Sequence, residues 1–227
     1  SKLAHTMIVE SKWRFLPKNY LMLDIRYSAN NYNPFSPQDE TQSASDPSLS
    51  RDSTPLRAQL GLSGLITPRL SLFMKGGYAN TYHDNGESFS GFIGLFEVSY
   101  RYEPRFRLSV GYQRDAQDSG FSNFYTLNRA FLKGHLSLSE RVSLSTKLSY
   151  DLYDYTPSKA IGDQGRTDPV TRALVTLSFP MSKRLVGQLS WSYEGNATTY
   201  TLPVDTPIKT DFAQYQRQLI TLSVLFN

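Results

Sequence analysis

The sequence contains no cysteine and no long run of apolar residues. The absence of cysteine excludes a disulfide framework and a thiolate metal site. Without an apolar run of about 18 residues, no segment qualifies as a transmembrane helix. Long helical stripes with apolar residues at i, i+3, i+4 and i+7 are missing as well. No phosphate-binding loop, metal-ligand cluster or nucleic-acid motif appears, so we expect neither a cofactor nor a nucleic-acid partner.

The sequence does contain short segments in which apolar and polar residues alternate. In residues 142–151, for example, Leu144, Leu148 and Tyr150 share one parity, and Lys147 and Asp151 share the other. A period of two is typical of a β-strand with one apolar face. Eleven such strands are expected at residues 3–15, 21–28, 56–66, 70–78, 92–102, 106–113, 129–138, 142–151, 172–179, 185–194 and 215–227.

The connections between these segments alternate in length. Tight turns are expected near residues 17, 68, 104, 140 and 182, and polar loops at about 33–54, 83–87, 115–121, 154–169 and 195–214. The hairpin unit recurs every 36 to 51 residues, a spacing that a propeller or solenoid could also have. A propeller blade would place four short strands in this length, whereas two long ones occur here. Strict alternation of tight turns and longer loops is the plan of transmembrane β-barrels.

The last strand adds a separate signal. Ile220, Leu222, Val224 and Phe226 form an apolar stripe that ends in an aromatic residue. A C-terminal amphipathic strand of this kind resembles the sorting signal of bacterial outer-membrane barrels. It departs from that signal in one respect, because Asn227 follows the aromatic residue.

Tyrosines recur at similar positions in the strands that leave the tight turns. Each of these strands begins apolar and reaches a tyrosine six or eight residues later, which is about 26 Å for eight residues and matches the apolar band of a membrane barrel. The predicted aromatic girdle is Tyr27, Tyr78, Tyr112, Tyr150 and Tyr193. A soluble barrel could use tyrosine as core filler, but its strands would be nearer five or six residues than the length seen here.

The face opposite the apolar stripe carries the charges. Its predicted lumen-lining residues are Arg26, Arg57, Lys75, Glu97, Arg101, Arg107, Arg129, Lys133, Lys147, Asp151, Arg172, Glu194 and Arg217. Basic groups outnumber acidic ones on this face, which is consistent with a wet channel that attracts anions. Small barrels also fill their interiors with arginine–carboxylate networks, so ion pairing is an equally good interpretation.

A catalytic function has little support in the sequence. His83 and Asp84 share one loop, and Asp115 and Asp118 share the next. This arrangement resembles the His/Asp site of outer-membrane aspartyl proteases. Asp-rich loops are also typical of a polar bacterial surface, and we expect no enzyme activity.

Several glycine-rich phrases resemble one particular family. They are residues 57–62 (RAQLGL), 75–78 (KGGY), 91–94 (GFIG) and 111–115 (GYQRD). They look like the β-barrel porin family associated with exopolysaccharide export, best over residues 55–155. The resemblance implies an outer-membrane conduit of sixteen to eighteen strands, more than this chain supplies.

Together these patterns predict one all-β domain over residues 1–227, an antiparallel up-and-down transmembrane barrel in the bacterial outer membrane with its C-terminus in the periplasm. Eleven strands are an odd number, so we expect the chain to be the C-terminal part of a barrel of 12 to 18 strands. The expected function is a channel for anionic solutes or exopolysaccharide. One alternative is a non-conducting barrel that anchors or seals a larger envelope complex, and the other is a barrel enzyme with a surface His/Asp site. Expected partners are outer-membrane lipid, lipopolysaccharide and other envelope proteins.

Overall fold

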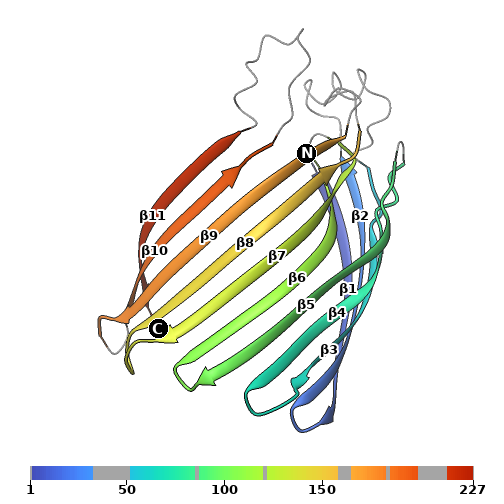
Figure 1. Ribbon diagram of the computed structural model, residues 1–227. Coiled ribbons are helices and arrows are strands. Elements are labelled where there is room, and N and C mark those ends of the chain that lie inside the picture. Colours follow the sequence, from blue (N-terminus) through green and yellow to red (C-terminus); the bar gives the residue numbers. More distant parts are fainter. Residues whose placement is uncertain are drawn as a thin grey trace.

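The computed structural model describes residues 2–32, 52–84, 87–119, 122–157, 165–182, 185–198 and 214–226. These residues form one antiparallel sheet in which each strand pairs with its neighbours in sequence (Figure 1). The strands are β1 (Lys2–Leu16), β2 (Asn19–Tyr32), β3 (Leu56–Leu65), β4 (Leu70–Asn80), β5 (Ser90–Glu103), β6 (Phe106–Asp118), β7 (Phe124–Ser137), β8 (Ser143–Tyr155), β9 (Arg166–Pro180), β10 (Leu185–Asn196) and β11 (Tyr215–Phe226). The predicted all-β, up-and-down architecture is confirmed.

The tight turns and the longer connections lie at opposite ends of the sheet. Figure 1 shows the five short connections at the lower end and the longer ones at the upper end of a strongly curled sheet. Several strands reach further into the upper connections than the alternation predicts. β6 continues to Asp118, and β7 already begins at Phe124. β8 continues to Tyr155, and β9 already begins at Arg166. The alternation misses these ends because polar residues there occupy both faces. Most of the loop predicted at 33–54, and much of the one at 195–214, lies outside the described residues.

The pairing register keeps side chains of one kind on one face. Between β7 and β8, Ala130 lies opposite Tyr150 and Leu132 opposite Leu148, whereas Lys133 lies opposite Lys147 on the other face. Successive side chains of a strand point to opposite faces, so a continuous register carries this sorting across the sheet. Irregularities occur only beside tight turns in the described strands, between Arg14 and Leu16 and between Arg101 and Glu103.

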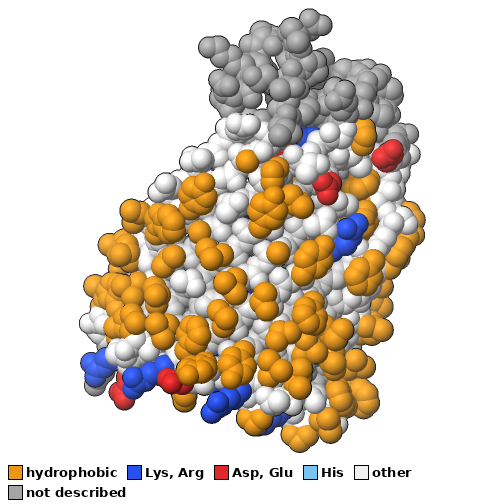
Figure 2. All heavy atoms as spheres, in the orientation of Figure 1, with side chains coloured by type: hydrophobic (Ala, Val, Ile, Leu, Met, Phe, Trp, Pro, Cys, Tyr) orange, Lys and Arg blue, Asp and Glu red, His pale blue; other side chains and the backbone are white. Residues whose placement is uncertain are grey.

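The exposure of the two faces is the reverse of that in a water-soluble protein. Leu60, Phe92 and Val110 are 60%, 64% and 56% exposed, while Ser149 and Asp151 are buried. Figure 2 shows apolar side chains spread over the middle of the visible face, with most of the visible charged side chains gathered near its two ends. In lipid, an apolar outer surface carries no hydrophobic penalty. The backbone N–H and C=O groups inside the sheet form hydrogen bonds to neighbouring strands, as lipid requires.

One close approach between strands requires glycine. A Cβ on Gly77 would lie 1.9 Å from the carbonyl oxygen of Ala58 and 2.6 Å from Cα of Gln59. The β3 and β4 backbones therefore approach more closely here than any side chain would allow. The buried apolar cluster at the upper end lies nearby and consists of Ala79, Phe89, Ile93, Ala116 and Phe124.

No helix in the described residues is long and apolar enough to cross a membrane. β1 pairs with β2 and β11 with β10, and no pairing between β1 and β11 occurs among the described residues. The strand number of the closed barrel stays a prediction.

Candidate functional site: the charged interior face

Ion pairs between strands that are not neighbours identify the interior face of the curled sheet. Lys133 on β7 reaches Glu97 on β5 at 2.8 Å, across β6. Arg57 on β3 reaches Asp115 on β6, also at 2.8 Å, across two intervening strands. Adjacent strands are about 4.8 Å apart, so such partners can meet only on the concave side of a sheet that curls. The residues that share this side are here called the interior face.

The strongest charge cluster on the interior face is centred on Asp151. Arg129 donates to both carboxylate oxygens of Asp151, from Nε at 2.8 Å and from Nη2 at 2.7 Å. Arg172 also donates to Asp151 and, through Nε, to Glu194 at 2.6 Å. Tyr215 on β11 donates its hydroxyl to Glu194 at 2.5 Å. A row of alternating charges thus joins β7, β8, β9 and β10, and the fully buried Asp151 is satisfied by two guanidinium groups.

Ion pairing accounts for only part of the predicted lumen-lining set. Among the thirteen residues, the structure pairs Lys75 with Asp24, Arg57 with Asp115, Lys133 with Glu97, and Arg129 and Arg172 with Asp151, with Arg172 also bound to Glu194. In the described residues, Arg26, Arg101, Arg107, Lys147 and Arg217 form no ion pair, and neither do Lys12 and Arg14 on the same face of β1. Among the interior carboxylates on the described strands, Glu10 is the one that forms no ion pair. The unpaired charge of the interior face is therefore positive.

Among the hollows that the described residues form on the interior face, two are lined by Lys147. One, of about 370 Å³, lies toward the tight turns and is lined by Glu97, Arg107, Lys133, Lys147, Ser145 and Thr176 among others. The other, of about 240 Å³, is lined by Arg129, Lys147, Arg172, Glu194 and Arg217, together with Leu174, Tyr193 and smaller residues. Both are large enough for several water molecules and have polar groups to bind them. The interior face can thus hold water and small anions.

The five girdle tyrosines occupy the outer face. Tyr27, Tyr78, Tyr112 and Tyr150 are 46% to 50% exposed, and Tyr193 is partly exposed. The hydroxyl of Tyr112 donates to Asn128 at 2.7 Å, and that of Tyr78 lies against Ser90. Their contact with a membrane interface stays a prediction.

The interior face also carries an aromatic cluster that the sequence patterns did not predict. The ring of Tyr125 lies 5.4 Å from the rings of both Tyr153 and Tyr155. Arg172 lies over Tyr153 and donates to its hydroxyl at 2.8 Å. Tyr153 and Tyr155 are two positions apart, so the alternation could have placed both rings on one face of a strand. Tyr155, however, lies in the stretch that was predicted to be a loop.

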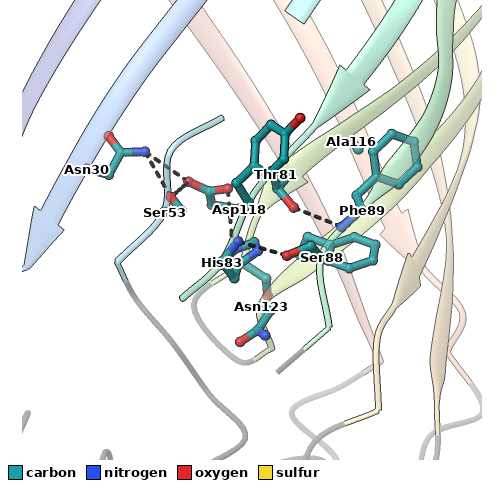
Figure 3. Close-up of polar contacts among 12 residues, drawn as sticks. Asn30, Ser53, Thr81, His83, Ser88, Phe89, Ala116, Asp118 and Asn123 are labelled. Atoms are coloured by element: carbon teal, nitrogen blue, oxygen red, sulfur yellow. Dashed lines mark hydrogen bonds and ion pairs between the residues drawn. The ribbon is translucent and has the colours of Figure 1, made fainter. Parts of the chain in front are cut away.

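The residues proposed for a His/Asp catalytic site lie at the upper end, where the structure brings only some of them together (Figure 3). His83 Nε2 lies 3.9 Å from Asp118 Oδ1. Asp115 instead binds Arg57, and Asp84 is exposed. The side chain of His83 is only 2% exposed and its ring stacks on Phe124 at 6.3 Å. The imidazole is therefore packed against Phe124 and has little contact with solvent.

Asp118 belongs to a network that the sequence did not predict. Asn30 Nδ2 and Ser53 Oγ each donate to Asp118 Oδ2 at 3.3 Å, and Asn30 also donates to Ser53 at 3.2 Å. Backbone hydrogen bonds join Asn30 to Ser53 in both directions. Ser53 lies at the end of a long polar loop without periodicity, so no pattern placed it beside β2. The network ties β2 to the end of β6 across the upper end of the sheet.

The protonation state of His83 follows from its surroundings. Burial lowers the pKa of His83 below its ordinary value, against the opposing effects of Asp118, the backbone at Asn123, and Asp84. The imidazole is therefore neutral at pH 7. His83 serves here as a packed aromatic ring beside Phe124.

Comparison with known proteins supports the fold but gives no family. No protein-family model matches the chain, and no curated protein matches it. Among solved structures, the FrpB iron transporter from Neisseria meningitidis superposes with a TM-score of 0.58 at 9% identity, over 87% of this chain and 36% of that one. The CymD monoaromatic hydrocarbon channel gives 0.47 at 12% identity, over 86% and 69% of the two chains. OmpT, an outer membrane protein of Vibrio cholerae, gives 0.47 at 8% identity, over 100% and 95%.

The likeness to FrpB defines the class of fold. The chain spans about a third of the length of that transporter and shares its antiparallel barrel architecture. Together with the apolar outer face, this shows that the chain has the fold of the transmembrane β-barrels of the outer membrane. The resemblance to the porin family of exopolysaccharide export has no support from a family match.

Proposed function

We propose that this chain forms the wall of a channel in the bacterial outer membrane, with a water-filled interior that favours anions. The observation that carries this proposal is the charge balance of the interior face. Seven cations on the described strands lack an ion pair there, against the single carboxylate of Glu10. Fixed positive charges along a narrow wet path raise the local concentration of anions. Anionic solutes or an acidic polysaccharide are the cargo classes we propose.

The orientation of the barrel is part of the proposal. In bacterial barrels the short turns lie on the periplasmic side and the longer loops on the cell surface. We therefore place the tight-turn end, with Lys18, Arg69 and Arg105, in the periplasm. The C-terminus then lies on the same side, and the outer tyrosines lie near the lipid headgroups. Lipid and lipopolysaccharide would contact the apolar outer face.

Ion selectivity tests the channel directly. Purified protein in a planar bilayer under a salt gradient should give a reversal potential that reports a preference for chloride over potassium. Replacing Arg107 and Lys147 together with glutamine should reduce this preference, because both cations line the larger hollow. The matched control is Lys18→Gln in a tight turn, which should leave it unchanged. Cation selectivity of the unmodified protein would contradict the proposal.

A barrel that anchors or seals a larger envelope complex without conducting is the second candidate. Contacts across the upper end favour it, because the Asn30–Ser53–Asp118 network and the Arg57–Asp115 pair link β2 and β3 to β6 across the strands between them. A folded protein that gives no conductance in the same bilayers would support this candidate over the channel.

A further inference from the structure

Two lysines face each other on the interior face, and only one of them has a carboxylate as its counter-charge. Lys133 on β7 and Lys147 on β8 lie directly opposite each other in the register. Like charges in such a cross-strand pair repel, and proteins ordinarily avoid the arrangement. Glu97 binds Lys133 at 2.8 Å, and the Lys133 amine also lies 4.6 Å from the centre of the Phe131 ring. These contacts balance the charge of Lys133 but do nothing for that of Lys147.

Lys147 has no carboxylate available to it. It forms no ion pair or hydrogen bond within the described residues. Asp151, two positions along β8 on the same face, is already held by Arg129 through two hydrogen bonds and by Arg172. The guanidinium groups and the Lys133 amine thus surround Lys147 with positive charge. A negatively charged group is what this position lacks.

The space beside Lys147 suits such a group. Lys147 lines both interior hollows, the one of about 370 Å³ and the one of about 240 Å³. The larger hollow adds Arg107 and His135 as possible donors, and hydroxyl groups at Ser99, Ser109, Ser145 and Thr176. Ser145 Oγ lies 3.1 Å from His135 Nδ1, so this part of the wall is already organised by hydrogen bonds. Ammonium, guanidinium and hydroxyl groups are the donors that recognise phosphate and carboxylate oxygens.

We propose that Lys147 is the centre of an oxyanion-binding site on the interior wall, with Lys133 and Arg107 as its flanking cations. Its ligand is a small solute that carries a phosphate or carboxylate group, and the surrounding hydroxyls bind the polar remainder of that solute. This proposal deepens the proposed anion channel by assigning a resting position to the anion. The site itself requires only the interior face and not conduction.

Site-resolved lysine labelling tests the proposal without depending on conductance. The full chain, folded in detergent micelles, is treated briefly with an acetylating reagent, and the modification of each lysine is measured by mass spectrometry. Sodium phosphate or sodium glucuronate is compared with sodium chloride at equal ionic strength. Either oxyanion should slow acetylation of Lys147 several-fold, because the bound anion holds the amine protonated and covered. Lys12, which lies over the Tyr20 ring and outside both hollows, is the internal reference and should not change.

A variant that keeps the reporting lysine completes the test. Arg107→Gln should weaken the protection of Lys147, whereas Arg26→Gln, another unpaired interior cation outside both hollows, should not. Retained heat-modifiable migration on a gel shows that each variant is folded. Protection by phosphate alone assigns the site to inorganic oxyanions, and protection by glucuronate alone assigns it to carboxylated sugars. Protection by neither anion, or a Lys147 that resists acetylation in chloride, would overturn the site. Protection in a protein that does not conduct would leave the site standing and refute the channel.

Discussion

Replacing Leu148 with arginine is expected to destabilise the folded chain in lipid by about 2–4 kcal/mol, the cost of a cation at the middle of a barrel's lipid-facing surface. Leu148 lies near the centre of β8 and is 49% exposed on the outer face. The guanidinium group would leave water for hydrocarbon, with no carboxylate in reach. The free energy of unfolding can be measured by urea titration of the protein in lipid vesicles.

The same substitution on the opposite face provides the matched control. Leu174 on β9 has a similar exposure of 40%, but it lies opposite Lys147 and lines both interior hollows. An arginine at Leu174 stays in contact with water, so its cost should be limited to like-charge repulsion, about 1 kcal/mol or less. Equal costs at the two positions, or a larger cost at Leu174, would show that the faces have been assigned the wrong way round.

Removing the carboxylate of Asp151 should produce the second large effect. Asp151→Asn preserves the shape of the side chain but leaves Arg129 without a carboxylate and Arg172 with Glu194 alone. Breaking a buried ion pair in this way costs about 3–5 kcal/mol when the partners are fully buried. Because the two arginine side chains are 23% and 32% exposed, we expect a loss of about 3 kcal/mol, at the lower end of that range. The same urea titration measures it.

Glu97→Gln is the corresponding change in the Lys133–Glu97 ion pair, which is more exposed to water. Its partner Lys133 is 41% exposed, so water and salt screen the interaction and the loss should be about 1 kcal/mol or less. Comparing the losses of unfolding free energy in the two variants separates the effect of burying Asp151 from the effect of forming an ion pair. If both substitutions cost the same, the Asp151 cluster has no special part in holding β7, β8 and β9 together.

The strands were predictable because a period of two is a local property of the chain. Leu148 and Lys147 are neighbours in sequence and lie on opposite faces, and the register between β7 and β8 keeps that sorting. The identity of the strands that meet across the interior was not predictable. Arg57 and Asp115 come together because the sheet curls, and the degree of curl is set jointly by all the strands.

The upper end was the least predictable region. Asn30, Ser53 and Asp118 come from three separate stretches of sequence, none of which has a repeating pattern at that point. His83 and Asp118 were singled out for their chemistry, and the structure places them 3.9 Å apart, yet burial against Phe124 turns the histidine into a packing residue. Burial depends on the whole fold, and sequence neighbours alone do not reveal it.

We expect this chain to fold into a wall of hydrogen-bonded strands embedded in lipid. Electrophoresis on a detergent gel, with and without boiling, tests it most directly. Such a wall resists detergent until it is heated, because its backbone groups are satisfied between strands. An unheated sample should therefore migrate differently from a boiled one. Identical migration, together with solubility in the absence of detergent, would contradict the account.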